Sequence, residues 1–202
     1  GATEWSSDKY KRNIYGTPSD SCGDYAWIQH MICSMVSGQG RMAVVMPQGI
    51  LFRNQETEIR KQLVESDLIE AVVTLGDKLF YGTGLSPCFL IIRRMKPAHH
   101  SGRILMIDGS KILTQKRAQN ILEENDIDRL YSLYQNYSDE EDYSRIVTLQ
   151  EIRDKEYNLS PNRYVVYHKE EIRPYAEVLA EFKHAYEEVK RLEEEFSLLI
   201  NA

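Results

Sequence analysis

Three short apolar runs constrain the fold of this chain more than any other feature of its sequence. They are RMAVVMP at 41–47, LIEAVVTL at 68–75 and CFLIIRR at 88–94. Each run is continuous rather than alternating, which is typical of strands buried on both faces of a sheet. Between the first two, Ile59, Leu63 and Val64 keep helical spacing. Strand, helix and strand in this order predict a right-handed parallel crossover over 41–75, within an open α/β sheet.

The ends of these predicted strands locate a functional edge. The carboxyl ends of parallel strands meet at one edge of an α/β sheet, and ligands bind there. This edge receives PQG at 47–49 and the loop that begins at Gly76. The run at 88–94 returns after about a dozen residues without a helical pattern, so we expect an antiparallel strand. The long loop between the second and third runs is therefore predicted to lie at the functional edge.

Composition limits the class of protein. With 202 residues and 42% hydrophobic content, the chain can bury a core, as one domain or as one domain with an appendage. The apolar runs fall well short of the roughly 20 residues that span a bilayer, so no membrane contact is expected. Cys22, Cys33 and Cys88 are widely spaced, which argues against a disulfide framework or zinc site and favours the reducing cytoplasm. The histidines are scattered apart from the pair at 99–100, so no metal site is expected.

Charge is divided unevenly along the chain. Residues 1–118 carry 15 Lys and Arg against 11 Asp and Glu, whereas residues 119–202 carry 10 against 20. The modest positive balance of the first part is compatible with a nearby polyanion and equally with an ordinary solvated surface. The two parts are expected to do different work.

The remaining segments predict loops and short regular elements. Residues 1–23 are polar and rich in turn formers, and their aromatic side chains indicate an ordered loop. DYAWIQHMICSMV predicts a helix with Asp24 as its N-cap. We further expect a strand at RILMIDGS, short helices at QKRAQNILEEN and DIDRLYSLYQNY, and a switch from helix to extended chain across DYSRIVTLQEIRDKEYNLSPNRYV.

The end of the chain carries a heptad seam. Apolar residues recur there with alternating spacings of three and four, at Tyr175, Val178, Phe182, Ala185, Val189, Leu192, Phe196 and Leu199. A lone helix with such a face requires a covering surface. That surface can be a partner helix or the chain's own domain, and the bulk of Phe and Tyr at seam positions is unusual for a simple two-stranded coil.

Six segments together point to a family. They are DYAWIQHMI, GRMAVVMPQGILFR, EIRKQLVESDLIEAVVTL, LFYGTGLSPCFLII, RILMIDGS and YNLSPNRYV. In this order and spacing they resemble the carboxyl-terminal half of the modification (M) subunit of type I restriction-modification systems. That family is similar to the adenine-specific DNA methyltransferases, which transfer a methyl group from S-adenosylmethionine to the exocyclic amine of adenine. The resemblance implies the carboxyl-terminal half of a doubly wound, Rossmann-like sheet with a helical extension.

Two motifs of that family are missing. Such enzymes hold S-adenosylmethionine on a glycine-rich turn and grip adenine with an Asn-Pro-Pro-Phe motif. No two prolines here are adjacent, and no glycine-rich turn follows a strand at the start of a βαβ unit. We therefore expect a fragment without catalytic residues of its own, which does not bind the cofactor and is inactive alone. The expected divisions are a loop that follows the missing motif (1–23), a partial catalytic domain (24–118), a helical and extended linker (119–173) and a coiled-coil-like helix (174–202).

The resemblance also implies a pocket for the target base. An enzyme that modifies a base within a duplex must swing it out of the stack and hold it against aromatic or apolar faces. The proposed pocket residues are Phe80, Tyr81, Gly82, Thr83 and Gly84, with Pro47 and Gln48 at the same edge. Core packing of Phe80 is the alternative for the loop, and a plain strand-ending turn is the favoured interpretation of 47–48.

Contacts with DNA and with other subunits complete the expectations. Arg93, Arg94 and Lys96 form a basic cluster that can contact phosphates, although a charged strand end that keeps the edge soluble is slightly preferred. The resemblance implies DNA, a specificity subunit, a second modification subunit and a restriction subunit as partners, with the specificity subunit reading the DNA site. The alternative function is a non-catalytic assembly module that binds a partner subunit through the seam.

Overall fold

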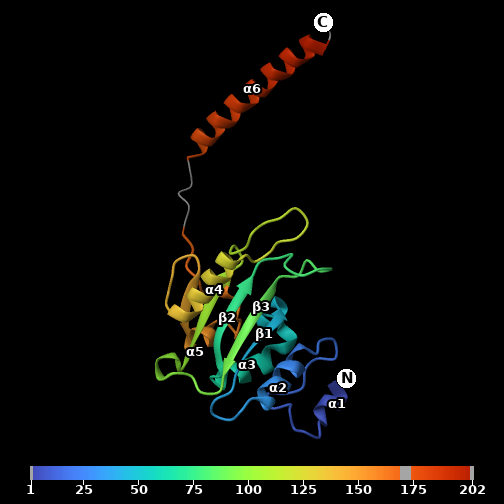
Figure 1. Ribbon diagram of the computed structural model, residues 1–202, viewed down its shortest axis with the longest axis vertical. Coiled ribbons are helices and arrows are strands. Elements are labelled where there is room, and N and C mark those ends of the chain that lie inside the picture. Colours follow the sequence, from blue (N-terminus) through green and yellow to red (C-terminus); the bar gives the residue numbers. More distant parts are fainter. Residues whose placement is uncertain (1, 169–173, 201–202) are drawn as a thin grey trace. The chain divides into compact units, whose positions relative to one another are not determined.

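The computed structural model describes residues 2–168 and 174–200, and the side chains of 4–168 and 174–197. The chain divides into two compact units, Gly1–Tyr167 and His168–Ala202 (Figure 1). The first unit contains the sheet, and the second contains one long helix. No described helix combines the length and the apolar character that crossing a membrane requires.

The first unit is built on a five-stranded mixed sheet. The strands are β1 (Arg41–Pro47), β2 (Ile69–Leu75), β3 (Pro87–Arg93), β4 (Arg103–Gly109) and β5 (Ser144–Thr148). Their order across the sheet is β1-β3-β2-β4-β5. β3 is antiparallel to both β1 and β2, β4 is parallel to β2, and β5 is antiparallel to β4. The α/β class and the antiparallel return strand are as expected.

The crossover differs from the prediction in one respect. β1 and β2 run in the same direction, as strand, helix and strand predict, but β3 lies between them. The carboxyl ends of β1, β2 and β4 still meet at one edge of the sheet, which we call the rim. Pro47 pairs with Pro87 there, and Thr74 pairs with Cys88.

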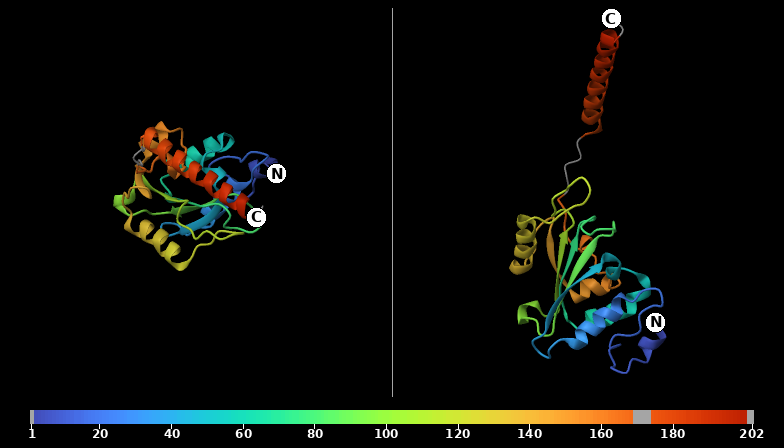
Figure 2. Two further views of the ribbon diagram at one scale, coloured as in Figure 1. Left: turned by 90° about the horizontal axis from the view of Figure 1, so that it is seen from above. Right: turned by 45° about the vertical axis from the view of Figure 1, so that its right-hand side comes forward.

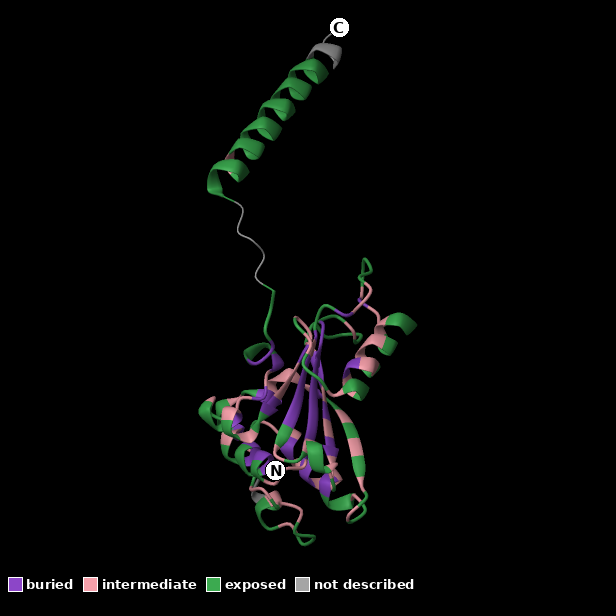
Figure 3. Ribbon diagram, turned by 90° about the vertical axis from the view of Figure 1, so that its left-hand side faces the viewer, coloured by how far each residue is buried: buried purple, intermediate pink, exposed green. Residues whose placement is uncertain are grey.

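The burial of β1 corrects a second expectation. β2 is buried along its whole length, whereas most residues of β1 are exposed or intermediate (Figure 3). Val45, in the middle of β1, is 45% exposed. β1 is an edge strand of the sheet as described, so its continuous apolar run does not report burial on both faces within this chain.

Helices cover both faces of the sheet. α2 (Asp24–Ser34), α3 (Thr57–Glu65) and α5 (Leu149–Asp154) pack on one face, where Ile28, Leu63 and Ile152 join a core with Val72 and Leu90. α4 (Glu124–Asn136) packs on the other face, where Leu133 meets Ala71, Val73 and Ile107. Figure 2 shows α4 and α2 on opposite sides of the strands. The alternating side chains of the central strands supply both cores.

Local differences from the predictions have identifiable causes. Gly23 is the N-cap of α2, and Asp24 is its first helical residue, with the carboxylate turned to Arg53. No helix forms at 115–123, because α4 begins at Glu124 behind a capping box that joins Glu123 and Asp126. The segment that begins at 142 starts as strand β5 before it becomes α5.

The acidic region is part of the sheet unit. Residues 119–167, expected as a linker, contribute α4, β5 and α5 to the first unit. Residues 2–23 include the expected ordered loop, which is preceded by a short helix, α1 (Ala2–Ser6), that was not predicted. The backbone amide of Tyr15 donates to Gln29 of α2, and the Tyr15 hydroxyl donates to Ser66.

The second unit is α6 (Tyr175–Ile200), a helix of 26 residues. The predicted helix is therefore confirmed, and the seam residues up to Phe196 are exposed along it, with Phe182 at 65% and Phe196 at 64%. The side chain of Leu199 lies outside the described residues. What covers the seam stays a prediction.

Candidate functional site

Gln48 closes the base of the loop at the rim. This residue begins a short 3-10 turn (Gln48–Leu51) directly after β1. Its side-chain amide donates to the carbonyl oxygens of Leu75 (3.0 Å) and Pro87 (3.2 Å), which are the last residue of β2 and the first of β3. Its backbone amide donates to Ser86. Gln48 thus ties together both ends of the 76–86 loop, a role beyond the strand-ending turn that the sequence favoured.

The 76–86 loop presents its aromatic side chains outward. Phe80 is 48% exposed and Tyr81 is 92% exposed. Gly82 has φ +74°, a left-handed conformation that glycine adopts readily, and the hydroxyl of Thr83 accepts from the amide of Leu85. Phe80 therefore does not form part of the core of the described unit. The loop has the side chains needed to hold a flat ring, and the pocket stays a prediction.

A second loop supports the first. Asn120 is nearly buried, and its side chain donates to the carbonyl oxygen of Asp77 (3.1 Å) while its backbone amide donates to that of Lys78 (3.0 Å). Gln119 donates to the carbonyl oxygen of Leu79. Asn120 could not be predicted as an anchor of the loop, because its partners lie more than 40 residues away.

Asp108, near the end of β4, is a partly buried acid at the rim. Thr74 and the amide of Ser110 donate to one of its oxygens, and Tyr167 donates to the other. Burial raises the pKa of Asp108, but these hydrogen bonds outweigh burial and hold the pKa below its ordinary value. An acid whose oxygens already accept three hydrogen bonds is suited to fixing the end of β4 rather than to moving a proton.

The predicted phosphate contacts lie at the other edge of the sheet. Arg93 ends β3, which runs away from the rim, and donates to Glu70 (3.0 Å). Arg94 donates to the carbonyl oxygen of Ile32 (2.6 Å). Lys96 binds Asp67 (2.6 Å), and its side chain is only 2% exposed. All three cations bind groups of their own chain, which favours the charged strand end over phosphate contacts, and the phosphate role stays a prediction.

Glu70 organises that opposite edge. The carboxylate is buried at the start of β2 and accepts from Tyr134, His100 and Arg93. The His100 ring stacks on Tyr137 with 3.4 Å between centroids. One member of the histidine pair, expected in a surface turn, is therefore part of a structural network.

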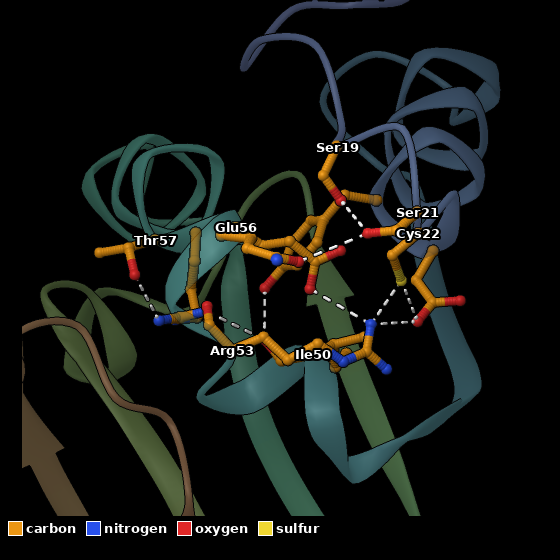
Figure 4. Close-up of polar contacts among 11 residues, drawn as sticks. Ser19, Ser21, Cys22, Ile50, Arg53, Glu56 and Thr57 are labelled. Carbon is orange, nitrogen blue, oxygen red and sulfur yellow. Dashed lines mark hydrogen bonds and ion pairs between the residues drawn. The ribbon is translucent and has the colours of Figure 1, made fainter. Parts of the chain in front are cut away.

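A further polar cluster lies where α2 begins (Figure 4). Among the described residues, Cys22, Asp24 and Glu56 bring three potential metal ligands within 4.8 Å of one another. The guanidinium of Arg53 donates to all three, at 2.9 Å to Asp24 and 3.4 Å to Glu56. A cation of the chain itself therefore holds this cluster, and burial raises the pKa of both Cys22 and Glu56.

Comparison with known proteins gives a consistent result. The profile of the N-6 DNA methylase family matches residues 2–172. The methylase subunit of the type I restriction enzyme MjaVII of Methanocaldococcus jannaschii is 37% identical over 196 residues, which cover 91% of this chain and 33% of that protein. The HindI methylase subunit of Haemophilus influenzae is 31% identical, over 76% of this chain and 36% of that protein.

Solved structures agree with the sequence comparison. The methyltransferase subunit of a type I restriction-modification system from Streptococcus thermophilus superimposes with a TM-score of 0.73 at 27% identity, and the match covers 81% of this chain and 34% of that one. The M protein of the type I restriction enzyme EcoKI, at 17% identity and a TM-score of 0.56, shares the fold. The match covers 45% of the EcoKI M protein, and it covers about a third of the two methylase subunits and of the Streptococcus thermophilus chain.

Proposed function

Because the chain belongs to the N-6 DNA methylase family, we propose that it is the carboxyl-terminal part of a type I modification subunit. The whole subunit transfers a methyl group from S-adenosylmethionine to the exocyclic amine of adenine in DNA. The match of residues 2–172 to the family profile carries this proposal. The chain contributes the base-holding rim and an assembly helix.

The rim supports the base-holding role. A flipped adenine needs a flat apolar wall and hydrogen-bonding groups beside it. Phe80 and Tyr81 offer exposed rings, and Thr83 with the loop backbone offers donors and acceptors. Gln48 and Asn120 fix the loop from both sides, so the rings stand on an anchored segment.

The chemistry divides between this chain and the rest of the subunit. When bound, S-adenosylmethionine supplies an already activated methyl group, so the protein mainly positions and polarises the amine. The residues of this chain do not fit that cofactor, because no glycine-rich turn follows a strand at the start of a βαβ unit. Cofactor binding and the Asn-Pro-Pro-Phe motif are therefore assigned to the part of the subunit outside this chain.

The free edge of β1 supports a continuing sheet. The side of β1 away from β3 has no strand partner within the described sheet, and its apolar run carries Val45 half-exposed. An unpaired apolar edge of this length favours strand addition. We assign this edge to the remainder of a doubly wound methyltransferase sheet.

The seam of α6 supports assembly with other subunits. Its exposed residues form one apolar face on a helix that is otherwise rich in Glu, and soluble chains seldom leave such a face uncovered. We assign it to contacts with the specificity subunit, in a complex that also holds a second modification subunit, the restriction subunit and DNA. The same exposed face also favours the alternative function, a non-catalytic module that binds a partner subunit through α6.

Methyl transfer tests the proposal. The whole subunit, assembled with its specificity subunit, is expected to move a labelled methyl group from S-adenosylmethionine to adenine in duplex DNA, with the product identified as N6-methyladenine. Label on cytosine, or none on DNA despite cofactor binding, would overturn the proposal. A whole subunit that assembles normally but gives no label would favour the assembly module.

A further inference from the structure

A hairpin at the rim carries cations that the proposed function does not use. Residues 113–122 fold back on themselves, with Thr114 and Ile121 paired as an isolated bridge. Gln119 and Asn120 attach this hairpin to the 76–86 loop through the carbonyl oxygens of residues 77–79. The two loops rise together beyond the carboxyl ends of the strands (Figure 1).

Four exposed cations lie on these two loops and on the turn that leads from β4 into the hairpin. They are Lys78, Lys111, Lys116 and Arg117, which we call the rim cations. Among the described residues, Lys116 has an ion pair at 3.2 Å with Glu123, whose side chain is half-exposed, and Lys78, Lys111 and Arg117 have none. The contrast with Arg93, Arg94 and Lys96 is direct, since the chain's own groups already bind those three side chains.

The backbone that carries the rim cations is fixed. Lys78 has φ +53°, a left-handed conformation that a residue with a Cβ seldom adopts. Asn120 holds this conformation by bonding the carbonyl oxygens on both sides of the Lys78 amide. A Cβ built on Gly76 would lie 2.1 Å from Leu113, so the two loops pack in close contact where they leave the sheet. A strained residue held in this way often marks a functional surface.

Acidic residues lie on one side of the rim cations. Residues 138–142 follow α4 and reach the rim beside Asp108, whose amide donates to Tyr143. This segment contains four consecutive acidic residues. Three of the first five residues of α4 are also acidic, and Glu123 precedes them. A polyanion is therefore repelled from the β5 side of the rim.

We propose that the rim cations bind the phosphates of the nucleic-acid strand whose base Phe80 and Tyr81 receive. This inference rests on the proposed function, since it names the backbone contacts of the same substrate. Phosphate contacts fix the register of a strand without reading its sequence. Four cations beside two exposed rings combine the phosphate contacts and stacking surfaces used by proteins that hold unpaired nucleotides.

Salt dependence tests the proposal. The whole subunit, assembled with its specificity subunit, is titrated with duplex DNA at several salt concentrations. The slope of log affinity against log salt falls by about 0.9 for each phosphate contact removed. The double variant Lys116→Ala/Arg117→Ala is expected to reduce the slope by about 2. Both side chains are exposed, so the variant should fold normally, and thermal unfolding of the same preparation checks this.

Two controls sharpen the comparison. Lys61→Ala removes one exposed cation from α3, away from the rim, and should leave the slope unchanged. Lys116→Arg/Arg117→Lys keeps both charges and should restore the slope of the unmodified protein. An unchanged slope in the double alanine variant, or an equal loss with Lys61→Ala, would overturn the proposal. Loss of subunit assembly with DNA affinity intact would also overturn it and point to an acidic protein partner.

Methylation by the unmodified complex separates this inference from the proposed function. If the complex methylates adenine and the double alanine variant keeps its slope, only the inference fails. If the slope falls as expected in the double alanine variant but the unmodified complex does not methylate adenine, the proposed function fails and phosphate binding by the rim cations is still supported.

Discussion

The side-chain amide of Gln48 donates a 3.0 Å hydrogen bond to the carbonyl oxygen of Leu75, where the rim loop begins. The same amide bonds Pro87, where that loop ends. One residue directly after β1 therefore holds both ends of the loop. Pairing between β2 and β3 alone would leave the loop more mobile. Base holding at the rim depends on this contact if the rings of the loop must meet the base in a fixed position.

Gln48→Ala should loosen the loop more than it destabilises the fold. It removes two hydrogen bonds to partly buried carbonyl groups, which together contribute on the order of 1–3 kcal/mol. Urea unfolding should show a loss of that size, and hydrogen exchange should show faster exchange confined to 76–86. Gln62→Ala is the matched control, because the side chain of Gln62 donates to the exposed Glu58 on the same helix. Uniformly faster exchange in every strand would contradict the loop-specific role.

Glu70→Gln should weaken the fold at neutral pH by about 2 kcal/mol, since a buried carboxylate that accepts three hydrogen bonds loses its charge. Burial raises the pKa of Glu70, but the bonds from Tyr134, His100 and Arg93 outweigh burial and hold it below the ordinary value of 4.5. Stability from this group is therefore present above pH 4.5 and is lost as the pH falls. Urea unfolding between pH 3 and 7 should show a smaller acid loss in the variant.

A control and a second group complete that prediction. Glu58→Gln replaces an exposed carboxylate on α3 and should change little at any pH. Burial lowers the pKa of His100 below its ordinary value more than Glu70 raises it. The unfolded chain therefore binds that proton more tightly, and stability also declines as the pH falls below 6.5 in both proteins. Equal stability of Glu70→Gln and the unmodified chain at pH 7 would refute the network.

The sequence predicts the helices and strands of this fold better than it predicts which strands pair. The three strands and the helices that begin at 24 and 57 follow from local patterns of apolar residues, because each pattern indicates the type of element that one segment forms. The insertion of β3 between β1 and β2 depends on which strands pair, and no single segment records that choice. The exposure of β1 could not be predicted for the same reason. An apolar strand can be covered by its own chain or by another part of the subunit, and the run of residues is the same in both cases.

Site residues divide in the same way. The position of the loop at the rim was predicted correctly, because strand direction alone determines it. The roles of Arg93, Arg94 and Lys96 could not be predicted, because their partners, Glu70, Ile32 and Asp67, lie more than 20 residues away. Gln48 and Asn120 are single amides without a motif, so only the folded chain shows what they hold.

Phe80→Ala, made in the whole subunit, should lower methylation more than DNA binding. If the exposed ring holds the flipped base, its loss costs on the order of 1–3 kcal/mol at that step, by analogy with base stacking in single-strand binders. Rates of methyl transfer and DNA affinities measured on the same preparation provide the comparison. Leu85→Ala, an exposed apolar side chain on the same loop, is the control. Equal losses in both quantities would argue against a stacking role.

The 202-residue chain alone should not bind S-adenosylmethionine appreciably. The strand turn that would carry the cofactor is missing from its sequence, and the rim is closed at its base by Gln48 rather than by glycines. Calorimetric titration of the chain should give no heat of binding, whereas the whole subunit should bind. A micromolar dissociation constant for the chain alone would contradict this prediction.

The seam of α6 should make association depend on concentration. Phe182, Val189 and Phe196 are at least half-exposed, and the Phe182 ring stacks on Tyr186 with 6.3 Å between centroids, which broadens the apolar face. Sedimentation of the chain should therefore show self-association that weakens in Phe182→Asp, because a charge on the seam is costly to bury. His184→Asp adds the same charge beside the seam and should have little effect.

The specificity subunit should compete with self-association, since the partner interpretation assigns both to one surface. A chain that stays monomeric at every concentration and ignores that subunit would instead favour a seam that packs against its own sheet unit.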